Sequence, residues 1–155
     1  MTRTYECMFL IDNDVVRTGW DKAKGAVNGL VEKHGGTVVT ARRWAERRLA
    51  YPIRHKNRAT YLLSYCELDP ARISGLRREL DISETVLRYL VLSADGVPDE
   101  ERAQASIEDG ADFVVPEPPS DDVLDVSTTR TRADDFADDD VDDMDSDHKL
   151  MRDED

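Results

Sequence analysis

The sequence has little cysteine and no apolar segment long enough to cross a membrane. Its 155 residues include two cysteines, Cys7 and Cys66, which lie far apart in the chain without CxxC spacing or a nearby histidine. This pattern indicates neither a zinc site nor a disulfide scaffold, so a reducing compartment is expected. The apolar run Met8–Ile11 is too short for a membrane span or a secretory signal. We therefore predict a cytoplasmic protein with no membrane partner.

Motifs of catalysis and cofactor binding are also absent. The sequence contains no GxGxxG, GxxxxGK[ST] or GxSxG pattern. His34, His55 and His148 have no spacing that would share a metal or pair a nucleophile with a base. The paired acids near the C-terminus lack the glycine and ligand spacing of a calcium loop. These absences predict a protein that is not an enzyme and that holds no metal, cofactor or small-molecule substrate.

Charge divides the chain into two parts. Residues 1–95 contain 16 basic and 12 acidic residues, a net charge of +4, and nearly all the aromatic and β-branched material. Residues 96–155 contain 5 basic and 22 acidic residues, which gives −17 and a total of −13 for the chain. The first part is long enough to form one hydrophobic core without disulfide bonds or metal ions to stabilise it. We predict a folded domain over residues 1–95 and a disordered acidic tail over residues 96–155.

Hydrophobic periodicity in the first part predicts six elements in the order βαββαβ. They are strands over 4–11, 37–53, 59–68 and 86–93 and helices over 16–34 and 70–83. A turn over 54–57 joins two strands into a hairpin, and Asp69 caps the second helix. This order is typical of the α+β ferredoxin-like fold, a four-stranded antiparallel sheet with two helices on one face. The first and third strands are then central, and Pro52 fits an edge strand because proline lacks a ladder donor.

Basic residues concentrate between Arg42 and Arg58. This segment holds seven Lys or Arg residues against one Glu, with Trp44 and Tyr51 interleaved. Guanidinium groups bind phosphate oxygens in a forked geometry and stack on bases, and aromatic rings add stacking surfaces. The pattern therefore suits contact with RNA, although a solvated edge strand protected by its charge remains the alternative.

An RRM domain has the same order of elements and binds RNA through aromatic residues on its central strands. Its third-strand signature matches residues 58–65 only at the two ends. We therefore expect Tyr61 and Tyr65 to pack in the core or to face a partner.

The segment Glu46–Arg54, with the sequence ERRLAYPIR, resembles the signature of bacterial small-subunit ribosomal protein six. The stretches Arg3–Glu6, Gly35–Gly36 and Leu80–Tyr89 also lie where that family has similar residues, so the resemblance covers about residues 3–93. Ala45 departs from the pattern, because the family usually has a glycine at this position, where a strand bulge occurs.

The resemblance implies a structural protein that binds the central domain of small-subunit ribosomal RNA together with ribosomal protein eighteen. Six candidate RNA-binding residues are carried over from the family, and charge and proximity add Lys56 and Arg58. The full set is Arg3, Arg47, Arg48, Tyr51, Arg54, Lys56, Arg58 and Arg88.

Two alternatives remain open at this stage. A small enzyme or ligand-binding domain on the same fold, such as an acylphosphatase-like hydrolase, would need an anion-binding loop after the first strand. There Asp12–Asp14 instead supplies acids that repel phosphate. The acidic tail is either an inert solubilising extension or a screen that weakens non-specific binding of RNA to the basic hairpin. Its apolar clusters, Phe113–Val115 and Val123–Val126, are either short docking segments or without function.

Overall fold

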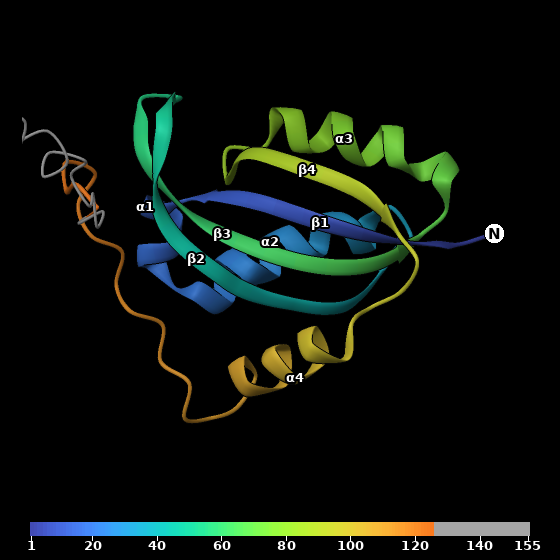
Figure 1. Cartoon of the computed structure of the whole chain (residues 1–155). Coiled ribbons are helices and arrows are strands. Elements are labelled where there is room, and N and C mark those ends of the chain that lie inside the picture. The colour runs from blue at the N-terminus through green and yellow to red at the C-terminus, as the bar shows by residue number, and fades with distance from the viewer. Residues whose placement is uncertain (126–155) are drawn as a thin grey trace, which may run out of the picture. The chain divides into compact units, whose positions relative to one another are not determined.

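The computed structural model describes residues 1–125 and contains one four-stranded antiparallel sheet. The strands are β1 (Arg3–Asp12), β2 (Thr37–Ile53), β3 (Lys56–Leu68) and β4 (Val86–Ala94). Their order across the sheet is β2-β3-β1-β4, so β1 and β3 are central and β2, with Pro52, forms an edge (Figure 1). The predicted βαββαβ topology is confirmed.

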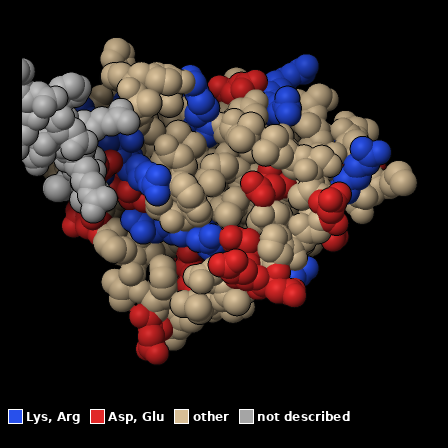
Figure 2. Space-filling model, in the orientation of Figure 1, with Lys and Arg blue, Asp and Glu red and all other residues tan. Residues whose placement is uncertain are grey.

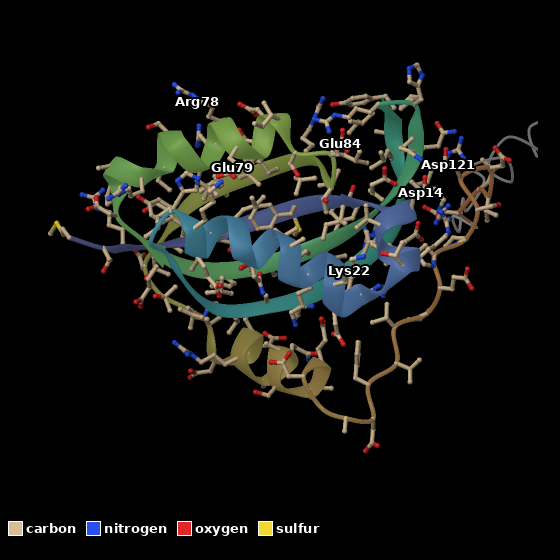
Figure 3. The ribbon with its side chains drawn as sticks, turned by 180° about the vertical axis from the view of Figure 1, so that it is seen from behind. Asp14, Lys22, Arg78, Glu79, Glu84 and Asp121 are labelled. Carbon is tan, nitrogen blue, oxygen red and sulfur yellow. The ribbon has the colours of Figure 1, made fainter. Side chains whose placement is uncertain are left out.

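Helices cover one face of this sheet. They are α1 (Asn13–Thr18), α2 (Trp20–Lys33) and α3 (Ile73–Ile82), the last preceded by a 3-10 turn over Pro70–Arg72. The core between the layers consists of apolar side chains from both, including Phe9, Ile11, Val27, Val31, Leu76 and Leu80. Asp69 accepts a hydrogen bond from the Ala71 amide at 2.9 Å, which confirms the predicted cap. The other face of the sheet is here called the open face (Figures 1 and 3).

The first helical region is broken in two, whereas the sequence predicts one helix over 16–34. Asp12 caps α1 by accepting from the Asp14 amide at 2.9 Å, so the chain becomes helical directly after β1. Gly19 then separates α1 from α2 with φ at +145°, a conformation that side chains with a Cβ rarely adopt. The apolar spacing from Trp20 onward belongs to α2 alone.

Strand β2 carries two bulges against β3. Its register shifts between Val38 and Thr40 and again between Arg43 and Ala45, which leaves Trp44 without an opposing residue. The bulge therefore exists with alanine at position 45.

The two cysteines meet inside the sheet despite their separation in sequence. Cys7 on β1 and Cys66 on β3 are both free and buried, and their Sγ atoms are 3.8 Å apart. The hydrogen bond between the thiols and their burial raise the pKa of Cys7.

Residues 96–125 correct the predicted start of disorder at residue 96. Helix α4 (Asp99–Glu108) runs along the outer edge of β2, and Ala105 is buried against it (Figure 1). Further along, Val115 packs against the main core. The composition of this region is too acidic for a core of its own, but its carboxylates find basic and main-chain partners on the preceding domain. Residues 126–155, over which the prediction also extends, lie outside the described residues.

None of the helices in residues 1–125 combines the length and the apolar composition that a membrane span requires.

Candidate nucleic-acid interface

The β2–β3 hairpin extends beyond the rest of the sheet (Figure 1). Its tip is a two-residue turn of Arg54 and His55, both with positive φ, flanked by the pair Ile53 and Lys56. The register shift between Arg48 and Ile53 leaves four β2 residues without β3 partners near this tip. The strand pairing is therefore irregular near the end of the hairpin.

Three predicted RNA-binding residues meet at this end and form what we call the hairpin-tip cluster: Tyr51, Arg54 and Arg88. The Arg88 guanidinium carbon lies 5.3 Å from the centre of the Tyr51 ring, and Arg88 also donates a hydrogen bond to the Tyr51 hydroxyl. Arg54 donates to the main-chain oxygens of Ser83 at 2.6 Å and Asp81 at 3.3 Å. These carbonyls lie at the C-terminal end of α3, where a cation is favoured. All three side chains of the cluster are exposed.

An exposed aromatic ring lies further along β2. Trp44 is 41% exposed, and its ring centre lies 5.7 Å from that of Tyr61 on β3. The Arg47 guanidinium carbon lies 4.8 Å from the Trp44 ring centre. Tyr61 itself packs on a small second cluster with Leu49 and Leu87, as expected for a packing residue.

The predicted residues Arg48 and Arg58 lie at the base of the hairpin, and the Lys56 side chain reaches from beside the turn to Asp12 and Asp14, so acids lie beside all three. Arg58 is 3% exposed, and its guanidinium binds both carboxylate oxygens of Glu46 at 2.7 and 2.8 Å. These bonds, with a further one to Asp125, raise the pKa of Arg58. Lys56 pairs with Asp14, which raises the pKa of Lys56 and lowers that of Asp14. We call this group the hairpin-base cluster.

A segment far along the chain supplies the remaining acids. Asp121 accepts from the main-chain amide of Asn57 at 2.9 Å and from that of Arg58 at 3.0 Å. Asp125 accepts from the Arg48 amide at 2.9 Å, and this bond is the main reason that the pKa of Asp125 is lowered. Figure 3 shows Asp14 and Asp121 beside the base of the hairpin.

Arg3 is not brought together with the other predicted residues. It lies at the start of β1 opposite Leu68, whereas the hairpin continues from the other end of β3 (Figure 1).

Tyr65, which the sequence predicts to pack together with Tyr61, is buried on the open face of the sheet. Its hydroxyl donates a hydrogen bond to Glu6 at 2.6 Å. Burial and this contact raise the pKa of Tyr65 to about 12.

Sequence reasoning missed the acids that neutralise the basic hairpin, above all Glu46, Asp121 and Asp125. The only sequence signal near Asp121 and Asp125 was the apolar cluster Val123–Val126, which was considered as a docking segment. Residues Val123 and Asp125 do contact the hairpin, while Val126 lies outside the described residues. Figure 2 shows basic side chains over β2 beside acidic ones over α4, so the positive charge is interrupted.

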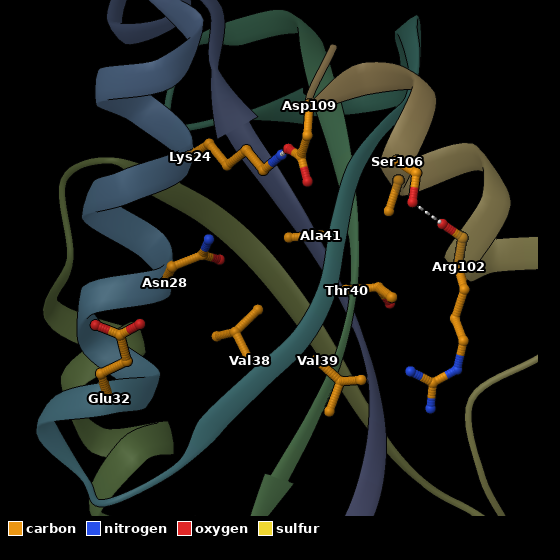
Figure 4. Close-up of a pocket in the computed structure, with 11 residues that line it drawn as sticks. Lys24, Asn28, Glu32, Val38, Val39, Thr40, Ala41, Arg102, Ser106 and Asp109 are labelled. Atoms are coloured by element: carbon orange, nitrogen blue, oxygen red, sulfur yellow. Dashed lines mark hydrogen bonds and ion pairs between the residues drawn. The ribbon is translucent and has the colours of Figure 1, made fainter.

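A hollow of about 400 Å³ lies between α2, β2 and α4 (Figure 4). Two of its charged side chains form an ion pair, with the Lys24 ammonium 3.1 Å from the Asp109 carboxylate. Ser106 donates to the main-chain oxygen of Arg102 at 2.9 Å. Within residues 1–125, no three His, Cys, Asp or Glu side chains are grouped so that they could hold a metal ion. This hollow therefore offers no recognisable catalytic arrangement.

Comparison with known proteins assigns the family. The family model described as Ribosomal protein S6 matches residues 4–93, from β1 to β4. The chain belongs to the ribosomal protein S6 family. Small ribosomal subunit protein bS6 of Fusobacterium nucleatum is 36% identical over 93 residues, covering 60% of this chain and 99% of that protein. The bS6 protein of Bartonella tribocorum is 34% identical over 102 residues, covering 66% of this chain and 76% of that protein.

The fold of this S6 family member is also that of a solved relative. The crystal structure of 30S ribosomal protein S6 from Thermotoga maritima aligns with a TM-score of 0.54 at 21% identity, covering 70% of this chain and 99% of that chain. The family has a structural role in the small subunit of the cytoplasmic ribosome of bacteria, and its members are not enzymes. The resemblance seen in the sequence is confirmed, and the acylphosphatase-like alternative is wrong.

Proposed function

We propose that this S6 family member binds the central domain of small-subunit ribosomal RNA together with ribosomal protein S18. The observation that carries the proposal is the hairpin-tip cluster of Tyr51, Arg54 and Arg88, with Arg47 beside it on β2. Among the described residues, none of these three arginines has a carboxylate partner, so their guanidinium groups remain able to bind phosphate.

The eight candidate residues take different parts in this proposal. The exposed arginines of the tip and Arg47 bind phosphates, and the Tyr51 and Trp44 rings offer stacking surfaces for unpaired bases. Lys56, Arg58 and the Arg48 main chain bind RNA only when their carboxylate partners move away. Arg3 binds a separate part of the RNA, since it lies at the opposite end of the sheet.

The open face of the sheet offers a surface for the proposed protein partner. Leu90 and Leu92 on β4 are 55% and 47% exposed and point to the same face, because they are two residues apart on one strand. Exposed apolar side chains in one place are typical of a docking surface. We assign the contact with S18 to this face.

Binding of the full chain to a central-domain RNA fragment tests the proposal, with S18 present and with an unrelated RNA of equal length as the control. We expect preference for the central-domain fragment and release at high salt, because phosphate contacts exchange with counterions. Equal affinity for the two RNAs would contradict the proposed RNA target. The variant Leu90→Asp/Leu92→Asp should lose the dependence on S18, and unchanged dependence would contradict the assigned face.

A further inference from the structure

The acidic strap, defined here as residues 121–125, binds both strands at the hairpin base. Asp121 accepts from the amides of Asn57 and Arg58 on β3, and Asp125 accepts from the Arg48 amide on β2. The Val123 oxygen accepts from Arg58 Nη1 at 2.6 Å, and Asp125 accepts from Arg58 Nη2 at 2.5 Å. Three main-chain amides and one guanidinium group therefore converge on anionic or carbonyl oxygens of the strap.

The groups that hold the strap are the groups that bind phosphate in other proteins. Adjacent main-chain amides and arginine side chains are common phosphate donors. The amides of Asn57 and Arg58 both point at one carboxylate, as they would at one phosphate group. Arg58 keeps its two bonds to Glu46 through Nε and Nη2, so departure of the strap frees Nη1 and the amides without unpairing the buried charge.

Little besides these polar contacts retains the strap. Val123 is 44% exposed and Leu124 is 67% exposed, so its apolar side chains bury only part of their surface. The Asp125 side chain is itself 44% exposed although Arg58 is buried, so water reaches the carboxylate and weakens its part of the ion pair. A polyanion at high local concentration can therefore displace the strap at small cost.

We propose that the amides of Arg48, Asn57 and Arg58 with the Arg58 guanidinium form a phosphate-binding site that the acidic strap occupies in the free protein. Its ligand is a phosphate group of the RNA backbone, which replaces the Asp121 and Asp125 carboxylates. That this phosphate group belongs to RNA rests on the proposed function. The site itself recognises the phosphate group, whichever molecule carries it. The apparent dissociation constant rises as the fraction of open sites falls, so a strap closed about 90% of the time weakens RNA binding about tenfold.

The test compares Asp121→Ala/Asp125→Ala with Asp112→Ala/Asp122→Ala in the full chain. Both double variants remove two negative charges from the same region, but Asp112 and Asp122 are exposed and have no hydrogen bond among the described residues. Affinity is measured for the central-domain RNA fragment with S18. Inorganic phosphate is titrated separately, with the amide resonances of Arg48, Asn57 and Arg58 as the readout.

We expect about tenfold tighter RNA binding for the first variant than for the second, from release of a site that is otherwise about 90% occupied. We also expect phosphate to shift the three amide resonances in the first variant only. Equal RNA affinities of the two variants, or equal phosphate responses, would overturn the inference. If all proteins bind central-domain and unrelated RNA equally, the proposed function fails, and the phosphate titration alone decides whether the site exists.

A measurement on the unmodified chain covers the case in which the first variant does not fold. RNA should move the backbone resonances of residues 121–125 to the positions of an unstructured peptide as the strap is displaced. Resonances of the strap that stay in place while RNA binds would overturn the inference.

Discussion

At the scale of single residues, Glu108 joins three elements. It is 9% exposed and accepts from Trp20 Nε1 at 2.7 Å, Lys24 at 3.2 Å and the Arg43 amide at 2.5 Å. The Arg43 amide belongs to the edge strand β2, and Glu108 satisfies it where no neighbouring strand exists. One carboxylate thus connects α4 with α2 and β2.

We expect Glu108→Ala to lower the free energy of unfolding by about 2 to 3 kcal/mol, because buried donors lose their acceptor. Urea denaturation followed by tryptophan fluorescence measures the change. Glu117→Ala removes an exposed carboxylate and serves as the control, with almost no expected effect. A loss of stability equal in the two variants would contradict this account.

Arg47 differs from the basic residues of the hairpin base because no carboxylate among residues 1–125 neutralises it. Arg47→Ala should lower the slope of log K against log salt for RNA binding by about one, since one phosphate contact is lost. The control is Arg78→Ala, which removes an exposed arginine from α3, away from the hairpin (Figure 3). Equal slopes for wild type and Arg47→Ala would show that Arg47 does not contact phosphate.

At the scale of elements, α4 is held against β2 by an ion pair as well as by Glu108. Arg42 Nε and Nη2 bind the two oxygens of Glu101 at 2.5 and 2.8 Å. The hydrogen bonds from Arg42 lower the pKa of Glu101 below its ordinary value of 4.5. Because the pKa is lower in the folded chain, this contact stabilises the fold fully above the ordinary value and is lost as the pH falls through the folded value.

We therefore expect Arg42→Met to destabilise the protein at neutral pH and to differ less from wild type as the pH falls below 4.5. Urea midpoints of both proteins across this range measure the difference. Glu101→Gln should show the same convergence, because it removes the other partner. A difference that is constant with pH would contradict a stabilising role of the ion pair.

At the scale of the whole molecule, the folded unit extends beyond the family domain. Residues 1–125 form one compact unit, although the family model ends at residue 93. These residues contain 17 basic and 22 acidic residues, a net charge of −5. The proposed affinity for RNA then depends on the local arrangement of the hairpin and not on the total charge.

A fragment of residues 1–95 should be less stable than residues 1–125 by about 2 to 4 kcal/mol, because the contacts of Glu101, Glu108 and Val115 are lost. Thermal and urea unfolding of the two fragments measure the difference. Equal unfolding midpoints would show that residues 96–125 add nothing to the stability of the domain.

Local sequence determined most of the sheet and helices. The limits of β2 follow from the β-branched residues after Gly35–Gly36 and from the turn over residues 54–57, and the cap at Asp69 follows from side-chain chemistry within a few residues. The Gly19 break was missed because the apolar spacing begins only at Trp20, so it carries no information about the residues before it, and the positive φ of Gly19 separates α1 from α2. The Glu46–Arg54 signature identified the family because it combines an edge-strand proline with arginines in one short segment.

Tertiary structure alone decided which charges are free. The sequence ranks Arg47 and Arg58 as equal cations, but Arg58 is buried between Glu46 and Asp125 while Arg47 lies on an exposed ring. It also ranks Asp125 as one acid among many in a tail, although this residue binds the hairpin from 67 positions away. Ion pairing depends on distances of a few ångströms in space, and residues so far apart along the chain come that close only when the sheet has formed.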